Sequence, residues 1–279
     1  MNKERISKYI TPLVPVKTYL KPEGRLDKKI ICIFFDIYGT LFISGAGDIG
    51  ISEKLSSRET EVENLLHDFG IQRESDSIIE QLFSSIDKKH IELKKKGVDF
   101  PEVEIDCLWM DILDINDIEV ARRFAILFEL IVNPVFPMPN IKKMLSVCKE
   151  LKVVMGIISN AQFYTKSLFK WFLNSKPDEL GFHSDLIFYS YIFGHAKPSM
   201  FMFDKASGKL EEMGIGRDNV LYVGNDMLND IFPAKKAGFN TALFAGDARS
   251  LRLRKDNPQC RHVYPDIVIT DLIQILDYI

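Results

Sequence analysis

Four short motifs in this sequence place reactive side chains directly after apolar runs or beside tight turns. They are DIYGTL with Asp36, IISN with Ser159 and Asn160, AKPS with Lys197, and VGNDMLND with Asp226 and Asp230. A carboxylate can attack an electrophilic phosphorus or carbon atom and form a covalent intermediate. Attack on a phosphoester brings two anions together, and Mg²⁺ held by hard oxygen ligands is the usual means of neutralising them. The motifs therefore predict a hydrolytic site with Asp36 as its nucleophile.

The remaining polar groups of the motifs have types and spacings that suit the same chemistry. Asp226 and Asp230 are spaced so that both carboxylates would lie on one face of a helix. A lysine such as Lys197 can hold the non-bridging oxygens of a transferred group. Backbone N–H groups in the tight turn at Gly39 and Thr40 can add further anion-binding donors. We therefore expect these groups to face one substrate.

Short, nearly continuous apolar runs provide the elements that must position these side chains. The runs cover residues 29–36, 152–159, 185–191, 219–226, 241–246 and 266–270. Such runs are typical of strands buried on both faces, and helical patterns at 139–152, 164–175, 199–214 and 230–238 alternate with the later ones. This alternation predicts an α/β fold with a Rossmann-like, doubly wound parallel sheet, whose strand ends would bring the motifs to one edge.

A helical stretch interrupts the alternation immediately after the first strand. Four helical patterns cover residues 56–70, 75–97, 102–113 and 117–132, and no convincing strand lies between Ser44 and Asn133. We predict an N-terminal extension at 1–28, an α/β core at 29–44 and 134–279, and an inserted helical cap at 45–133. The glycines at the left edge of the cap, Gly45, Gly47 and Gly50, are expected to form a hinge.

Composition and charge exclude several classes of protein. Hydrophobic residues make up 46% and charged residues 27% of the 279 positions, the balance of a globular protein. The net charge of −3 does not favour nucleic acid or an anionic membrane, and no apolar run is long enough to span a bilayer. The N-terminus lacks the apolar core of a signal peptide, and the separated cysteines indicate reduced thiols. We therefore expect a cytoplasmic protein with a small-molecule substrate and no nucleic-acid or membrane partner; its oligomeric state stays open.

In their order and spacing, the four motifs resemble those of the haloacid dehalogenase-like hydrolases. The resemblance covers residues 30 to about 245, and the helical insertion lies where that family carries its cap. It implies that Asp36 is the nucleophile, that Ser159 holds the phosphoryl oxygens and that Lys197 orients Asp36. We assign substrate contacts to Tyr38, Gly39, Thr40 and Asn160, and Mg²⁺ ligands to Asp36, Tyr38 through its backbone carbonyl, Asp226 and Asp230. Either Asn225 or Asp226 can be aligned with the first acidic position of the last motif, and we assign Asp226.

Tyr38 departs from the pattern of the phosphatases that this resemblance suggests. Those enzymes usually carry a second aspartate two residues after the nucleophile, which protonates the leaving group and then activates water. Tyrosine, with a pKa near 10, is a poor substitute at neutral pH. The 2-haloacid dehalogenases of the family carry tyrosine there, and a halide leaves without a proton. However, they also use an arginine soon after the first motif, whereas the first arginine after Asp36 here is Arg58.

Three functions follow from these observations. The preferred one is a Mg²⁺-dependent phosphatase of a small phosphorylated metabolite that acts through an aspartyl-phosphate, because Asp226 beside Asp230 resembles a retained metal site. The alternative is a metal-independent 2-haloacid dehalogenase that acts through an aspartyl ester. The third is a binding or regulatory protein that keeps the site but turns over negligibly because Tyr38 replaces the acid.

Overall fold

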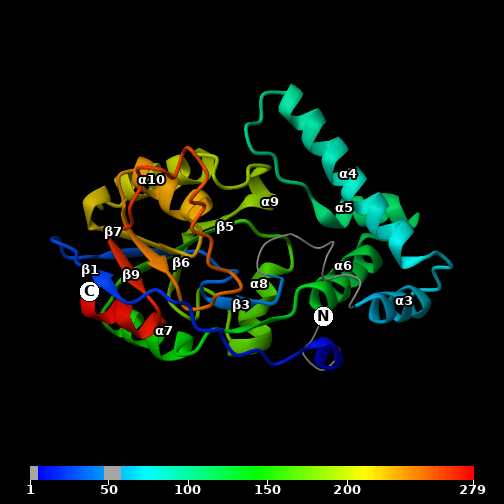
Figure 1. The fold of residues 1–279 in the computed structure, drawn as a ribbon, viewed down its shortest axis with the longest axis horizontal. Coiled ribbons are helices and arrows are strands. Elements are labelled where there is room, and N and C mark those ends of the chain that lie inside the picture. Colours follow the sequence, from blue (N-terminus) through cyan, green and yellow to red (C-terminus); the bar gives the residue numbers. More distant parts are fainter. Residues whose placement is uncertain (1–5, 47–57) are drawn as a thin grey trace.

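A seven-stranded sheet in the order β1-β9-β8-β7-β2-β5-β6 forms the centre of the fold (Figure 1). The structure is a computed structural model and describes residues 6–46 and 58–279. β1 pairs antiparallel with β9, and the other neighbouring strands of this sheet pair in parallel. The strands are β1 (Glu23–Gly24), β2 (Cys32–Phe35), β5 (Val154–Ser159), β6 (Phe182–Tyr189), β7 (Val220–Gly224), β8 (Asn240–Phe244) and β9 (Ile267–Ile269). The predicted Rossmann-like α/β core is confirmed.

Helices cover both faces of the sheet because its central strand is apolar on both sides. In β2, Ile33 and Phe35 join the larger hydrophobic core, which includes α7, whereas Cys32 and Phe34 join a second core that includes α10 and α11. All four side chains are fully buried, as expected for a strand between two layers of helices. The helices of these layers are α7 (Ile141–Glu150), α8 (Thr165–Leu168), α9 (Ser190–Phe193), α10 (Phe201–Glu212) and α11 (Phe232–Lys236).

A helical insertion separates β2 from β5 in the sequence and extends to one side of the sheet (Figure 1). Its helices are α3 (Glu59–Asp68), α4 (Ser75–Lys95), α5 (Ile105–Leu113) and α6 (Ile118–Val132). Trp109 lies at its centre, 1% exposed, with ring centroids 4.8 Å from those of both Phe124 and Phe128. The insertion thus has an aromatic core, and its four helices match the helical patterns of the sequence. Its role as a cap over the site stays a prediction.

Two short strands, which the sequence did not predict, join the insertion to the sheet. β3 (Phe42–Ser44) and β4 (Val135–Pro137) pair antiparallel, so the chain leaves and re-enters the core at adjacent points. The side chain of Asn133 reinforces the junction, because its Oδ1 accepts hydrogen bonds from Ser44 Oγ at 2.8 Å and from the backbone N–H of Ala46 at 3.0 Å. Of the expected hinge glycines, Gly47 and Gly50 lie outside the described residues.

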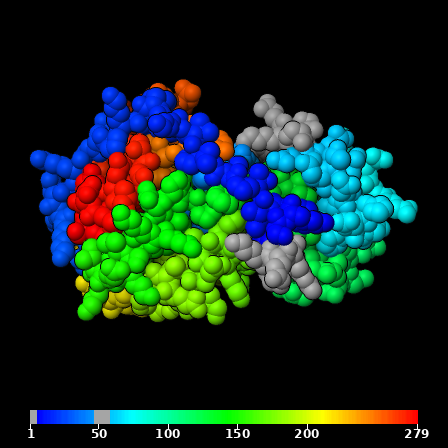
Figure 2. Space-filling model, turned by 90° about the horizontal axis from the view of Figure 1, so that it is seen from below, coloured from blue at the N-terminus to red at the C-terminus, as the bar shows by residue number. Residues whose placement is uncertain are grey.

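The N-terminal segment lies across the surface from the sheet to the insertion (Figure 2). Ile6 is fully buried and packs with the short helix η1 (Ser7–Tyr9) against α6. Further along, Thr18 Oγ1 donates to the carbonyl of Ala245 at 2.8 Å, and β1 then pairs with β9. The segment therefore contacts both parts of the molecule. Within the described residues, no helix is long and apolar enough to cross a membrane.

Candidate active site

The carboxyl ends of three adjacent strands bring the predicted catalytic side chains together. Asp36 follows β2 directly, Ser159 is the last residue of β5, and Asn225 follows β7. Because β2 lies between β5 and β7, these strand ends meet at one edge of the sheet, where open parallel sheets bind their ligands.

Lys197 is the centre of a buried ionic cluster at this edge. Its Nζ donates to Asp36 Oδ1 at 2.7 Å and to Asp230 Oδ1 at 2.5 Å. The hydroxyl of Tyr222 lies 3.1 Å from the same Nζ and 3.0 Å from Asp230 Oδ1. Burial opposes the charge of Lys197, but the two carboxylates outweigh it and raise its pKa above the ordinary value. The lysine is therefore charged at neutral pH and pairs with both carboxylates.

Asp230 is committed to this cluster through both of its carboxylate oxygens. Oδ1 contacts Lys197 and Tyr222, and Oδ2 accepts a hydrogen bond from the backbone N–H of Asp226 at 2.9 Å. Gly224 makes room for it, since a Cβ at that position would lie 2.4 Å from Asp230 Cγ. Burial raises the pKa of Asp230, although Lys197 acts in the opposite direction. Asp230 is therefore placed to hold the ammonium group of Lys197 in position.

Asp226 points to different partners. Its side chain caps the turn η4 (Met227–Ile231) by accepting from the backbone N–H groups of Leu228 at 2.8 Å and Asn229 at 3.3 Å. Arg254 donates to the same carboxylate from Nε at 3.1 and 3.2 Å and from Nη2 at 2.6 Å. Asp226 is thus the partner of a guanidinium group.

The neighbouring Asn225 faces the turn after the nucleophile. Its Oδ1 accepts from Thr40 Oγ1 at 3.0 Å, and its Nδ2 donates to the carbonyl of Ser250 at 2.6 Å. Gly39 has φ +82°, and a Cβ there would lie 2.5 Å from Ser250 Cβ and 2.8 Å from Asn225 Nδ2. The turn therefore requires glycine, and it places Gly39 and Thr40 against Asn225.

Ser159 and Asn160 lie on the other side of the nucleophile. Ser159 is fully buried, and its Oγ donates to the carbonyl of Asn160 at 3.2 Å. Asn160 Oδ1 accepts from the backbone N–H of Lys197 at 2.6 Å, and Nδ2 donates to the carbonyl of Lys197 at 3.3 Å. Asn160 therefore fixes the backbone of Lys197. Contact between substrate and either side chain stays a prediction.

Tyr38 is partly buried, and its hydroxyl lies 2.9 Å from Thr165 Oγ1. Burial and the nearby carboxyl of Glu129 raise the pKa of Tyr38. Glu129, a residue of α6, accepts from Asn133 Nδ2 at 2.9 Å and shares a hydrogen bond with Tyr164. Burial raises the pKa of Glu129 despite both hydrogen bonds. A carboxyl group from the insertion thus lies close to the tyrosine that replaces the usual acid.

Neither Glu129 nor Arg254 was predicted from the sequence, and only Glu129 could have been recognised there. Glu129 is an acidic residue inside the apolar stretch FAILFELIV, and such a residue on a buried helix is a reason to look for a partner. Arg254 belongs to the loop DARSLRLR and lies 28 residues after its partner Asp226. No spacing rule connects the two.

The carboxylates do not fit a divalent cation as the side chains are placed. A carboxylate offers about four lone-pair positions, and those of Asp226 are taken by Arg254, the side chain of Asn229 and two backbone N–H groups. Both oxygens of Asp230 have protein donors as well. Among the described residues, Lys197 binds the Asp36 carboxylate at Oδ1. The Mg²⁺ site therefore stays a prediction from the motifs.

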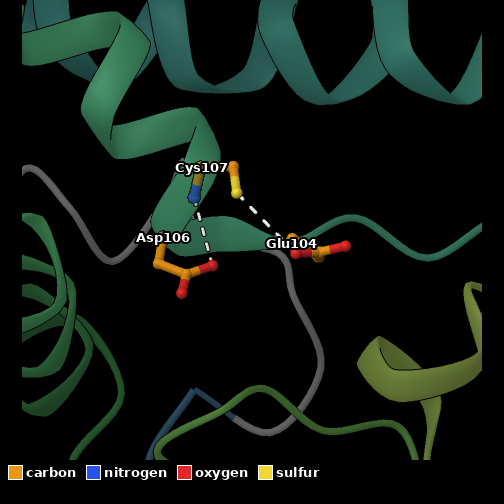
Figure 3. A group of neighbouring side chains, drawn as sticks. All are labelled: Glu104, Asp106 and Cys107. Atoms are coloured by element: carbon orange, nitrogen blue, oxygen red, sulfur yellow. Dashed lines mark hydrogen bonds between the residues drawn. The ribbon is translucent and has the colours of Figure 1, made fainter. Parts of the chain in front are cut away.

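A second group of possible metal ligands lies in the insertion. Figure 3 shows Glu104, Asp106 and Cys107, whose ligand atoms all lie within 4.8 Å of one another. Glu104 and Cys107 are exposed, and the buried Asp106 accepts from Arg122 Nε at 2.8 Å. Because Arg122 already neutralises the buried carboxylate, we assign no metal site to this group.

Several solved structures match the chain over most of its length. The chain has the haloacid dehalogenase-like fold. A 2-haloacid dehalogenase from Pseudomonas syringae matches with a TM-score of 0.52 and 19% identity over 89% of this chain and 97% of that one. A phosphatase of the same fold from Thermococcus onnurineus matches with a TM-score of 0.53 and 16% identity over 89% and 97%. The L-2-haloacid dehalogenase from Xanthobacter autotrophicus gives 0.50 and 16% over 88% and 96%.

These similarities establish the fold and leave the reaction open, since the same fold carries dehalogenases and phosphatases at similar scores. No protein-family model and no curated protein sequence matches the chain. The reaction must therefore be argued from the site.

Proposed function

We propose that this chain is a hydrolase in which the Asp36 carboxylate displaces a leaving group that departs without a proton, with 2-halo acids as the substrate class. The observation that carries the proposal is the environment of Tyr38. Its hydroxyl is hydrogen-bonded to Thr165, and its pKa is raised. Such a phenol is a poor general acid for a leaving alkoxide, and at neutral pH it is not ionised and so does not take a proton from water. A halide needs no proton to leave.

The reaction would proceed in two steps through a covalent intermediate. Oδ2 of Asp36 attacks the carbon that bears the halogen, the carbon–halogen bond breaks, and the halide leaves with the electron pair, which forms an aspartyl ester. Water then attacks the carbonyl carbon of this ester, and the bond between that carbon and the ester oxygen breaks. The 2-hydroxy acid leaves with an oxygen from Asp36, the carboxylate is regenerated with an oxygen from water, and one proton passes to solvent.

The charges of the site support displacement at carbon more than attack on phosphorus. Asp36, Asp226 and Asp230 face two cations, Lys197 and Arg254, so the cluster has no excess of positive charge. A phosphomonoester would bring about two further negative charges to this cluster, whereas a 2-halo acid brings one. Lys197 binds Oδ1 of Asp36 and so leaves Oδ2 for the attack.

The Mg²⁺-dependent phosphatase favoured by the motifs is the second candidate, and Glu129 is the observation in its favour. A carboxyl group with a raised pKa beside Tyr38 has the properties of the general acid that an alkyl phosphate requires. With Asp226 as a metal ligand, this candidate requires the carboxylate to exchange Arg254 for the metal ion.

A substrate panel separates these functions. Parent enzyme is given a 2-chloro acid, an aryl phosphate and an alkyl phosphate, each with Mg²⁺ and with EDTA, and chloride and phosphate release are measured. We expect chloride release that EDTA does not change, and its loss in Asp36→Asn but not in Asp277→Asn, which alters an exposed carboxylate. A single turnover in H₂¹⁸O should place the label on Asp36. Phosphate release that requires Mg²⁺ would establish the second candidate, and no release from any substrate would favour a non-catalytic binding protein.

A further inference from the structure

Arg254 forms an ion pair with Asp226, and the surrounding loop holds the arginine in place. Its guanidinium approaches both oxygens of Asp226, with the shortest contact at 2.6 Å. The Asp226 side chain is 9% exposed and that of Arg254 is 28% exposed, so the pair is largely shielded from solvent. Two-point contact between a guanidinium and a carboxylate is among the stronger ionic interactions in proteins.

The backbone around Arg254 is attached directly to the last catalytic motif. The backbone N–H of Arg252 donates to the carbonyl of Asn225 at 3.0 Å, and that of Met227 donates to the carbonyl of Arg252 at 2.9 Å. These bonds form a short parallel bridge between residues 226 and 252. Arg254 itself has φ +47°, a left-handed conformation that non-glycine residues seldom adopt. The loop therefore holds this arginine in a conformation that an unconstrained chain would avoid.

We propose that Arg254 is a built-in counter-cation for Asp226, which takes the place that a divalent ion would otherwise occupy at this carboxylate. Asp226 keeps the hard oxygen chemistry of a metal ligand, and the guanidinium supplies both the charge and the hydrogen bonds that satisfy it. The parent protein then binds divalent cations weakly at this position. Loss of the guanidinium frees the Asp226 carboxylate and creates a metal site there. The inference rests on the proposed function in one respect, since it explains how that reaction runs without metal.

The test is a Mn²⁺ titration of the full chain, followed by electron paramagnetic resonance of the free ion, with no substrate present. Arg254→Ala should bind Mn²⁺ about ten- to a hundredfold more tightly than the parent, because a positive charge next to Asp226 is removed. Arg254→Lys keeps the charge and should stay close to the parent. Arg254→Ala combined with Asp226→Asn should return to the parent affinity. Arg217→Ala is the matched control, since Arg217 is half exposed and pairs with Glu211 on the surface.

Each outcome of the titration decides the proposal. It is overturned if the parent binds Mn²⁺ as tightly as Arg254→Ala, if Arg254→Ala gains no affinity, or if the gain survives Asp226→Asn. Should Arg254→Ala fail to fold, Arg254→Gln keeps the length of the side chain without its charge and carries the same expectation. Chloride release in EDTA reports on the proposed function independently. A parent that binds no Mn²⁺ and releases no chloride would disprove the function and leave this inference standing.

Discussion

At the scale of single residues, the proposed function assigns no proton transfer to the hydroxyl of Tyr38. We expect Tyr38→Phe to keep chloride release from a 2-chloro acid within about threefold, because a hydroxyl that transfers no proton is dispensable, whereas loss of a true acid–base group typically costs about 10²–10⁴-fold. Steady-state kinetics on the parent, on this variant and on the exposed control Tyr264→Phe measure the effect. A hundredfold loss confined to Tyr38→Phe would mean that the hydroxyl takes part in the reaction.

The opposite substitution addresses the second candidate. Tyr38→Asp restores the usual acid two residues after the nucleophile. If the chain hydrolyses phosphates, this variant should release phosphate from an alkyl phosphate about 10²-fold faster than the parent. A parent that is already as fast as the variant would show that another group, with Glu129 the nearest candidate, supplies the proton.

Glu129 predicts a pH dependence of stability with a definite sign. Its pKa is raised above the ordinary value of 4.5 mainly by burial, so the folded chain holds this proton more tightly than the unfolded chain. Below pH 4.5 both states are protonated, and the folded state is penalised progressively as the pH rises above that value. We compare the free energy of unfolding of Glu129→Gln with that of the parent by urea denaturation. The variant's value minus the parent's value should be larger at pH 7.5 than at pH 4.5. A difference that does not vary with pH, or that equals the one seen for the exposed Glu63→Gln, would contradict this.

The contrast between Lys197 and Arg254 shows how far sequence reasoning reaches at this scale. The motifs predicted the side chains that meet at the strand ends, and the structure places Lys197 between Asp36 and Asp230. Arg254, the partner of Asp226, comes from a loop whose course depends on the whole fold, so the sequence predicted Asp226 as a metal ligand but did not reveal this ion pair.

At the scale of elements, the aromatic core of the insertion depends most on Trp109. This side chain is 1% exposed and packs against both Phe124 and Phe128 of α6. Trp109→Ala should lower the free energy of unfolding by about 3–5 kcal/mol, the usual cost of removing a large buried aromatic side chain. Thermal and urea unfolding followed by near-ultraviolet circular dichroism measure the loss. Ile192→Ala on α9, where the side chain is 57% exposed, is the control and should cost less than about 0.5 kcal/mol.

Element boundaries show where periodicity alone was sufficient. The long apolar runs predicted β2, β5, β7, β8 and β9, because strands buried on both faces leave no polar positions. β6 begins three residues before its predicted start, since the residues His183 to Asp185 at this edge of the sheet are exposed. β3 and β4 have three residues each, and one of them ends in Pro137, so neither carries a periodic signal of its own. Their pairing depends on the position of the insertion.

At the scale of the whole molecule, the N-terminal segment connects the insertion to the sheet independently of the β3–β4 junction. The buried Ile6 packs against α6, and Lys8 pairs with Asp68 of α3 at 3.4 Å. About ten residues later, the backbone N–H of Val16 donates to Oδ1 of Asp247, which belongs to the loop that continues to Arg254. The segment thus restrains the insertion relative to the loop that shapes the site.

Loss of this restraint should show in the local stability of the insertion. Ile6→Ala removes buried contacts worth about 2 kcal/mol or more, and local opening of α6 should become easier by a similar amount, equal to roughly thirtyfold faster hydrogen exchange. Exchange followed by mass spectrometry should show the effect in the peptides of α6 and η1, with the amides of β2 and β7 unchanged. Tyr19→Ala is the control, because that side chain is 71% exposed in the same segment. Equal exchange in α6 for the parent and Ile6→Ala would show that β3 and β4 alone hold the insertion in place.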